Sequence, residues 1–201
     1  MIFLFDLDGT LTVSETLPTI ARHFSVGKDV ETMTNEAVSG AVPFAESFAR
    51  RVGMLGHLSV ERVSELLAGV RLFDGPVAFI RRNTDKCFVV SSNLDCWCRS
   101  LAGRIGCEGF YSEAKVENDS VADITSILCK EDVVAGFRQS GEKVVFIGDG
   151  DNDFEAMREA DIAIVCAMTH TPTPRLRSVA DYVVDSETEL CDILERLLVS
   201  K

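Results

Sequence analysis

The feature that most restricts this chain is its first strand, which joins a fully apolar run to two acids. Residues 2–5 are Ile-Phe-Leu-Phe, and a run that is apolar on both alternating faces is typical of a strand inside a parallel sheet. Asp6 and Asp8 follow two residues apart, so their carboxylates point the same way in an extended chain and repel each other. A bound cation is the simplest way to keep both acids there. Gly9 allows a sharp exit, and Thr10 is able to hydrogen-bond back to the backbone.

Composition narrows the class of protein. The chain has 201 residues, of which 46% are hydrophobic, enough for one domain or for a core domain with a small insert. The formal net charge of −12 argues against nucleic acid or an anionic membrane as a partner. Because the seven cysteines are odd in number and several lie in apolar runs, we expect reduced thiols, with Cys87, Cys129 and Cys166 in the core. We also expect a cytoplasmic protein without a signal peptide or a membrane span.

The order of helical and extended patterns predicts an α/β fold. Residues 14–70 show helical periodicity and no convincing strand. Further on, strands and helices alternate, which is typical of a parallel sheet covered on both faces. The strands expected there are residues 86–90, 143–147, 162–166 and 182–184. We therefore predict a doubly wound parallel sheet, formed by residues 1–13 and 71–201, with a small helical cap, residues 14–70, inserted after the first strand.

Three of the expected strands end in unusual polar residues. They are Asp6 and Asp8, then Ser91-Ser92-Asn93, then Asp149, Asp151, Asn152 and Asp153. Open parallel sheets place binding sites beyond the carboxyl ends of their strands. Carboxylates gathered at that edge suit Mg²⁺, which proteins hold through a few carboxylates, water and a substrate phosphate. An EF-hand calcium loop is excluded, because the loops that begin at Asp6 and Asp149 lack the required Gly and Glu.

Taken together, these motifs resemble those of the haloacid dehalogenase superfamily of phosphatases. The resemblance is carried by Asp6-Leu7-Asp8-Gly9-Thr10, Ser91, a Lys that opens a helix, and Gly148-Asp149-Gly150-Asp151-Asn152-Asp153. It covers essentially the whole chain in the same order. It implies a Rossmann-type core with the first motif on the central strand, a cap that closes over the site, and Mg²⁺ as the cofactor.

The resemblance also implies a role for each motif residue. Asp6 is expected to attack phosphorus and form an aspartyl phosphate, while Asp8 acts as general acid and then general base. Lys130 is expected to offset the charge on the transferred group. Asp6, Asp149 and Asp8, the last through its main-chain carbonyl, are the implied metal ligands, and Asp153 orients metal-bound water. The residues implied in phosphate binding are Gly9, Thr10, Ser91, Ser92 and Asn152.

The helical segment is similar to the cap of the phosphoserine phosphatases within this superfamily. The similar stretches are Ser14-Glu15-Thr16, Asn35 to Gly40, Pro43-Phe44 and Arg50-Arg51-Val52. The similarity implies that Glu15 holds a substrate ammonium, that Arg51 holds its carboxylate, and that Phe44 packs against the substrate. Gly9 stands where those enzymes usually carry Ser, and Ser92-Asn93 stands where they carry Gly-Gly. The second departure lies beside the expected phosphate and leaves the identity of the substrate open.

The leading hypothesis is a Mg²⁺-dependent phosphohydrolase acting on a small phosphorylated metabolite, with phosphoserine as first choice, in a monomer or homodimer. A phosphotransferase that passes the phosphoryl group to an alcohol such as homoserine is an alternative, as is a phosphatase for another small metabolite. A receiver-like signalling module also uses carboxylates at strand ends. Such a module needs neither a cap nor an acid two residues after its nucleophile, so the inserted helical segment and Asp8 both argue against it.

Several residues are less informative. Lys115 is the alternative to Lys130. None of the histidines at 23, 57 and 170 belongs to a motif, so we expect them at the surface or in packing roles. Trp97 is expected in the core, and the loop 169–174 is expected at the rim of the pocket. Residues 107–125 fit the scheme poorly, and only a short strand near 109–111 is predicted there.

Overall fold

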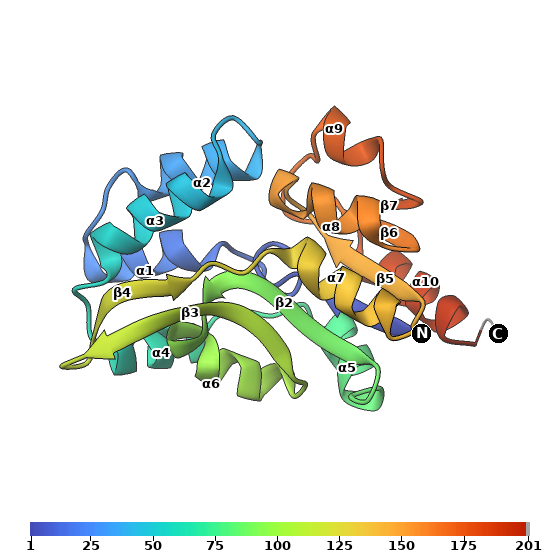
Figure 1. The fold of residues 1–201 in the computed structure, drawn as a ribbon, viewed down its shortest axis with the longest axis horizontal. Helices are drawn as coiled ribbons and strands as arrows, with labels where there is room; N and C mark the ends of the chain where they lie inside the picture. The colour runs from blue at the N-terminus through green and yellow to red at the C-terminus, as the bar shows by residue number, and fades with distance from the viewer. Residues whose placement is uncertain (200–201) are drawn as a thin grey trace.

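The fold is a seven-stranded sheet with helices on both faces (Figure 1). The computed structural model describes residues 1–199. The strands are β1 (Ile2–Phe5), β2 (Cys87–Leu94), β3 (Gly109–Glu117), β4 (Ser120–Ser126), β5 (Val144–Gly148), β6 (Ile162–Cys166) and β7 (Tyr182–Val184). The helices are α1 (Thr16–Phe24), α2 (Val30–Val38), α3 (Phe44–Leu55), α4 (Val60–Ala68), α5 (Asp74–Arg82), α6 (Asp95–Ile105), α7 (Lys130–Gln139), α8 (Phe154–Glu159), α9 (Pro174–Arg177), α10 (Glu187–Val199) and a 3₁₀ turn, η1 (Asp151–Asp153). Within these residues, no helix is long and apolar enough to cross a membrane.

The order of the strands places β1 at the centre of the sheet. The order is β4-β3-β2-β1-β5-β6-β7, and all neighbouring strands are parallel except β3 and β4. The chain builds outward from β1 through β2 and β3, and then returns to the other side of β1 for β5, β6 and β7. Parallel sheets bind ligands where the winding direction reverses in this way. The predicted doubly wound sheet, with the first motif on its central strand, is confirmed.

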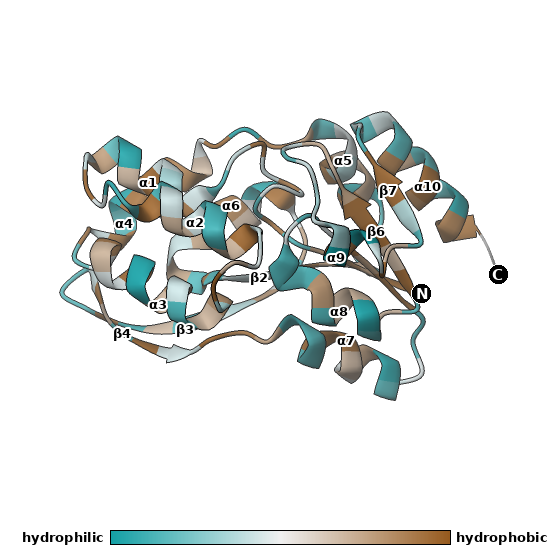
Figure 2. Cartoon of the chain, turned by 90° about the horizontal axis from the view of Figure 1, so that it is seen from above, coloured by the Kyte–Doolittle hydropathy of each residue, from teal (hydrophilic) through white to brown (hydrophobic). Residues whose placement is uncertain are grey.

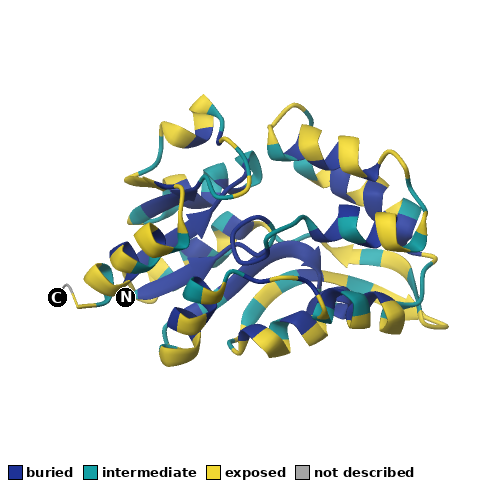
Figure 3. Ribbon diagram, turned by 180° about the vertical axis from the view of Figure 1, so that it is seen from behind, coloured by how far each residue is buried: buried dark blue, intermediate teal, exposed yellow. Residues whose placement is uncertain are grey.

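The apolar run of β1 is buried on both faces, as predicted. Phe3 and Phe5 join the core cluster that includes residues of α5, α6 and α10. Ile2 and Leu4 join a second cluster with residues of α7 and α8. Figure 2 shows the helices with alternating apolar and polar patches, and Figure 3 shows the central strands as buried. The alternation of side chains along one strand therefore builds two separate cores.

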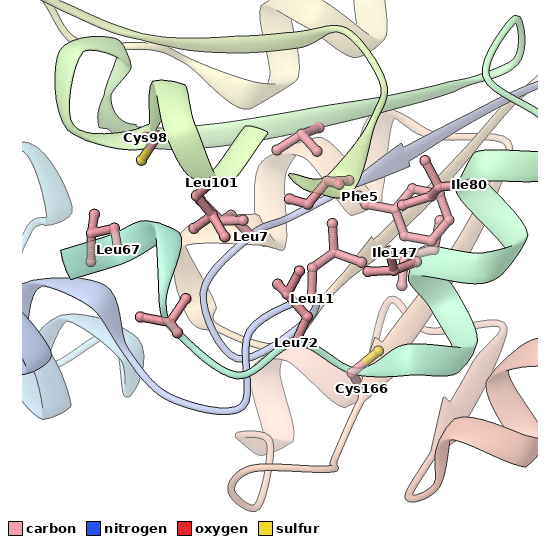
Figure 4. Packing of buried hydrophobic residues seen from close by; sticks show 14 of the residues in the cluster. Phe5, Leu7, Leu11, Leu67, Leu72, Ile80, Cys98, Leu101, Ile147 and Cys166 are labelled. Carbon is pink, nitrogen blue, oxygen red and sulfur yellow. The ribbon is translucent and has the colours of Figure 1, made fainter. Parts of the chain in front are cut away.

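The larger core continues beyond the end of β1. Leu7 and Leu11 are fully buried, and Figure 4 shows Leu7 beside Leu101 and Leu11 beside Leu72. The apolar residues of the first motif therefore pack into the protein and hold the polar residues between them at the edge of the sheet.

Helices α1 to α4 lie between β1 and β2 in the chain. The two ends of this helical segment run side by side, since Thr12 and Leu72 form an isolated bridge and the Val13 N–H donates to the Arg71 carbonyl at 3.0 Å. Helices α1, α2 and α3 pack on one another, whereas α4 packs mainly against α6 (Figure 1). The division into a cap at 14–70 and a core stays a prediction, with α4 as the helix that joins the two.

The hairpin β3–β4 is the largest difference from the predicted elements. Its strands have nine and seven residues, where only a short strand near 109–111 was predicted. Asn118 and Asp119 form the turn, with positive φ angles of 49° and 60°. Short hairpin loops require such angles, and Asn and Asp favour them. This pair, directly after residues 113–117, in which polar and apolar side chains alternate, was the signal that could have predicted the hairpin.

The tip of this hairpin contacts the helical segment. The Asp119 carbonyl accepts a hydrogen bond from the Val60 N–H at 2.8 Å, and the Asp119 carboxylate accepts one from the Glu61 N–H at 3.1 Å. Both donors belong to the first turn of α4, whose N–H groups have no partner inside the helix. The hairpin therefore caps a helix that is distant in sequence.

The cysteines are free, as expected. Cys87 and Cys166 are buried, but Cys129 is exposed, so its predicted place in the core was wrong. Cys129 directly precedes α7, where the chain reaches the surface before it turns into the helix.

The packing around β1 gives a prediction on stability. Phe79 is fully buried, and its ring centroid lies 5.3 Å from that of Phe3 and 6.5 Å from that of Phe5. We expect Phe79→Ala to lower the free energy of unfolding by about 3–5 kcal/mol, because it leaves a cavity against the central strand. Urea denaturation measures this, with Phe79→Leu as a control that retains most of the volume and loses less. An Ala variant as stable as the wild type would contradict this packing.

Candidate active site

The site lies at the carboxyl ends of β1, β2 and β5. Phe5 pairs with Val89 of β2 and with Ile147 of β5, so the polar residues that follow come to one edge. Most of the predicted site residues line one pocket there: Asp6, Asp8, Glu15, Phe44, Arg51, Ser91, Ser92, Lys130, Asp149 and Asn152. Three further predicted residues, Asp153, Gly9 and Thr10, are buried. They do not line the pocket but lie against Lys130 or Asp149, which do. Ser91 to Asn93 form the end of β2 rather than following it.

Lys130 is the central cation of the site. Its Nζ lies 2.5 Å from Asp6 Oδ1 and 2.6 Å from Asp153 Oδ1, and all three side chains are buried. The other oxygen of Asp153 accepts hydrogen bonds from the N–H groups of Asp149 and Gly150, each at 3.1 Å. This network joins β1, α7 and the loop after β5.

Lys115, the alternative to Lys130, lies elsewhere. It is on β3, its side chain is 62% exposed, and it pairs with Glu117 at 2.6 Å. Lys130 is therefore the lysine that contacts Asp6.

Asp149 has one carboxylate oxygen held and one free. Thr10 Oγ1 donates to Asp149 Oδ1 at 3.1 Å, while Asp149 Oδ2 is buried without a hydrogen-bond partner. The predicted local hydrogen bond of Thr10 is instead made by Thr12, whose hydroxyl bonds to the Ser14 carbonyl at 2.9 Å. Gly9 has a φ of 72°, and a Cβ there would lie 2.0 Å from Asp149 Oδ2. In this orientation of Asp149 there is no room for a side chain at residue 9, and the positive φ also favours glycine.

The cluster has an excess of acid. Oxygens of Asp6, Asp149 and Asp153 lie within 4.8 Å of one another. Burial, together with repulsion from Asp153, raises the pKa of Asp6 to about 7. Burial and repulsion from Asp6 also raise the pKa of Asp149. Burial lowers the pKa of Lys130, but Asp153 and Asp6 outweigh this effect and raise it, so Lys130 stays charged.

These residues fit a divalent cation. The available donors are carboxylate oxygens, which Mg²⁺ prefers, and the free oxygen of Asp149 is a buried acceptor without a partner. A cation at this place would offset the repulsion that raises the carboxylate pKa values. Asp6 and Asp149 are the ligands that the geometry supports.

The Asp8 carboxylate is held by the first turn of α1. Its Oδ1 accepts a hydrogen bond from the Thr16 N–H at 2.7 Å. Burial raises the pKa of Asp8, while its hydrogen bonds with Thr16 lower it. The net increase suits a carboxyl group that must carry a proton before it donates one.

Asn93 supports this arrangement, although no role was predicted for it. Its Nδ2 donates to Thr16 Oγ1 at 2.7 Å, so it ties the end of β2 to the first turn of α1. Ser92 Oγ instead donates to the Leu128 carbonyl at 3.2 Å. Of the two departures at this position, Asn93 is the one that contacts the residue holding Asp8.

The helical segment contributes a buried arginine to the pocket. Arg51 Nη1 donates to Thr34 Oγ1 at 2.9 Å and Nε donates to the Ser47 carbonyl at 3.2 Å. Nη2 is buried without a partner. The guanidinium also lies 5.8 Å from the ring centroid of Phe44. Arg51 is therefore held by its neighbours while one donor stays available to an anion.

Glu15 provides a carboxyl group in the same pocket. Burial, then repulsion from Asp8 and Asp6, raises the pKa of Glu15 to about 8. A ligand cation beside this carboxylate would lower that pKa again. The pocket thus offers an anion-binding group and a cation-binding group above the carboxylate cluster.

His170 is a contact that sequence reasoning missed. His23 and His57 are exposed and Trp97 is fully buried, as expected. The ring of His170, however, lies with Nε2 3.1 Å from the Asp149 carbonyl and Nδ1 3.4 Å from Asp149 Oδ2. No motif marks this histidine, because only the path of the chain after β6 brings it to the site.

The comparisons with known proteins agree with this geometry. The sequence model of the haloacid dehalogenase-like hydrolase family matches residues 1–161 of this chain. The chain therefore belongs to this family of hydrolases, and the predicted superfamily and enzyme class are confirmed.

Several of the similar proteins are phosphoserine phosphatases. The chain is 26% identical to phosphoserine phosphatase of Methanocaldococcus jannaschii, over 96% of each chain. It is 27% identical to that of Halobacterium salinarum, over 95% of each chain. A substrate-bound phosphoserine phosphatase structure shares its fold with a TM-score of 0.83 at 24% identity, over 97% of both chains. A phospho-aspartyl intermediate analogue of phosphoserine phosphatase gives a TM-score of 0.82 over the same shares, also at 24% identity.

The Lys130 network gives a second prediction. Lys130→Met leaves Asp6 and Asp153 buried without their cation, and we expect the metal-free protein to lose about 3–5 kcal/mol of unfolding free energy. Lys115→Met removes an exposed pair of similar length, and we expect a change below about 1 kcal/mol. Chemical denaturation of both variants in EDTA measures the contrast. Similar losses in the two variants would contradict the central position of Lys130.

Proposed function

We propose that this chain is a Mg²⁺-dependent phosphoserine phosphatase, which releases L-serine and phosphate through an aspartyl phosphate on Asp6. The observation that carries the proposal is the pocket in which Glu15 and Arg51 face the buried carboxylate cluster. An amino acid presents an ammonium and a carboxylate, and these two side chains match them in charge. The names of the relatives support the same substrate.

The phosphoryl end of the reaction uses the floor of the pocket. Lys130 holds Oδ1 of Asp6, and we assign the attack on phosphorus to the other oxygen. Asp8 gives its proton to the departing serine oxygen and then takes one from the water that hydrolyses the aspartyl phosphate. Bound by Asp6, Asp149 and the Asp8 carbonyl, Mg²⁺ would offset the negative charge of the phosphate and the carboxylates.

The remaining motif residues hold this arrangement in place. Asp153 holds Lys130 and the N–H groups of Asp149 and Gly150. The Ser91 hydroxyl and Asn152 line the pocket, and we assign them to the phosphate oxygens, with Ser92 and Gly9 contributing backbone groups. Thr10 acts indirectly in this proposal, by holding Asp149.

The substrate end uses the helical segment. We assign the substrate carboxylate to Arg51, whose free Nη2 supports a charge-assisted hydrogen bond. Glu15 is assigned to the ammonium and Phe44 to the apolar wall. Because Glu15 directly precedes Thr16, which holds Asp8, recognition of the amino acid and orientation of the general acid depend on one turn of α1.

Transfer of the phosphoryl group to another alcohol would use the same intermediate. Product analysis with added homoserine distinguishes this alternative, since a phosphorylated acceptor would appear beside inorganic phosphate. A receiver-like module is no longer a candidate, because the chain belongs to a hydrolase family. The proposal includes a small phosphorylated metabolite as partner and a cytoplasmic location, and sedimentation would distinguish a monomer from a homodimer.

The nucleophile gives a third prediction. Asp6→Asn retains size and hydrogen bonding but removes the attacking anion, so we expect turnover of p-nitrophenyl phosphate to fall by about three orders of magnitude or more. The unfolding transition should stay close to that of the wild type. Asp85→Asn, at an exposed position, is the control. Activity of the Asp6 variant above about a tenth of wild type would reject the assignment.

The substrate gives a fourth prediction. Arg51→Lys removes the planar guanidinium, which Lys cannot reproduce, so we expect kcat/KM for phosphoserine to fall about ten- to a hundredfold. Hydrolysis of p-nitrophenyl phosphate, which has neither ammonium nor carboxylate, should change far less. The neighbouring exposed Arg50 supplies the matched control, Arg50→Lys. Equal losses on both substrates, or a wild type inactive on phosphoserine, would reject the amino-acid substrate while leaving a phosphatase.

A further inference from the structure

Asp149 lies just beyond the end of β5, where the sheet no longer supplies partners for its main chain. Side chains hold both its main chain and its carboxylate instead. Asp153 Oδ2 accepts from the Asp149 N–H at 3.1 Å, and Thr10 holds Oδ1 at 3.1 Å. The third contact is His170, whose Nε2 lies 3.1 Å from the Asp149 carbonyl. Oδ2 accepts no hydrogen bond, although Nδ1 of His170 lies 3.4 Å from it. The orientation of this carboxylate therefore depends on its neighbours.

The direction of the hydrogen bond from His170 follows from its partner. A carbonyl oxygen can only accept, so Nε2 carries the proton. In the neutral ring Nδ1 then accepts, and Thr169 Oγ1 lies 3.1 Å away to donate to it. Thr169 Oγ1 is also 3.5 Å from the Gly9 carbonyl. Residues 169 and 170 therefore lie against both the first-motif loop and the loop after β5.

The segment that carries His170 is anchored a second time. Thr173 Oγ1 donates to Asp151 Oδ1 and also accepts from the Leu176 N–H at 3.1 Å, which caps α9. Arg175 Nη1 lies 3.3 Å from Asp151 Oδ2. Contacts at Asp149 and at Asp151 hold the segment 169–175 along the loop after β5, so the ring of His170 has a defined place.

His170 does not belong to the pocket that holds the nucleophile and Arg51. It lines a neighbouring hollow between the segment 169–173 and the end of α2, and its side chain is 32% exposed. It therefore reaches the reaction through Asp149 alone.

We propose that His170 is a positioning residue, which sets the orientation of Asp149 through the main-chain carbonyl and thereby the affinity of the site for its divalent cation. The inference rests on the metal site of the proposed function. It assigns part of the metal affinity to a loop outside the motifs that define the family.

The test compares three variants of the full chain, His170→Ala, His170→Gln and His170→Asn. Mn²⁺ binding without substrate, followed by electron paramagnetic resonance, reports metal affinity independently of turnover. We expect His170→Ala to weaken Mn²⁺ binding about tenfold, as for other residues that hold a metal ligand. The Gln amide can take the place of Nε2 and should restore most of the affinity. The shorter Asn amide cannot reach it and should behave like Ala.

Activity at increasing Mg²⁺ concentrations provides the second readout. The Ala variant should need about tenfold more Mg²⁺ for half-maximal activity, with kcat at saturating Mg²⁺ close to wild type. His57→Ala, at an exposed and distant position, should match the wild type in both measurements. If the Ala variant fails to fold, the contrast between Gln and Asn gives the same test.

Asp149→Ala separates failure of this inference from failure of the proposed function. Loss of Mn²⁺ binding in Asp149→Ala together with unchanged binding in His170→Ala would overturn the role of His170 alone. Equal losses in the Gln and Ala variants would also overturn it, because packing rather than the hydrogen bond would then be at work. Unchanged binding in Asp149→Ala would overturn the metal site and this inference with it.

Discussion

The structure depends on the buried contact of Lys130 with Asp6 and Asp153. The three residues come from α7, the end of β1 and the turn after β5, and their charges meet where water is excluded. Burial, together with the repulsion among acids that a single lysine cannot balance, raises the pKa values of Asp6 and Asp149. The apolar strands hold these carboxylates together against their repulsion, and the site gains a place that favours a divalent cation.

A second constraint joins the helical segment to this cluster. The Thr16 N–H holds Asp8, and Asn93 holds the Thr16 hydroxyl. Glu15 precedes this residue, so the group proposed to recognise an ammonium sits one residue from the one that orients the general acid. Movement of α1 relative to the sheet would disturb both together. This coupling would make turnover sensitive to the position of the helical segment relative to the sheet.

The sequence predicted those elements whose local pattern follows from a single physical rule, such as burial on both faces of a strand. The alternation of strands and helices predicted the doubly wound sheet, because buried parallel strands read as continuous apolar runs. The hairpin β3–β4 was not predicted, because its strands are mostly polar and its register is irregular. Cys129 was misplaced because its apolar neighbours suggested burial, while the start of α7 carries it to the surface.

The sequence by itself determined the central strand, the acids that follow it and the class of chemistry, since apolar runs and paired carboxylates constrain their surroundings wherever they occur. Lys130 was indicated by the resemblance to the family, which implies a Lys at the start of a helix. The tertiary structure alone decided that Thr10 holds Asp149, that Asn93 supports Asp8 through Thr16, and that His170 reaches the Asp149 carbonyl. These contacts join residues far apart in the chain, and the sheet order and crossovers bring them together, which local periodicity cannot report.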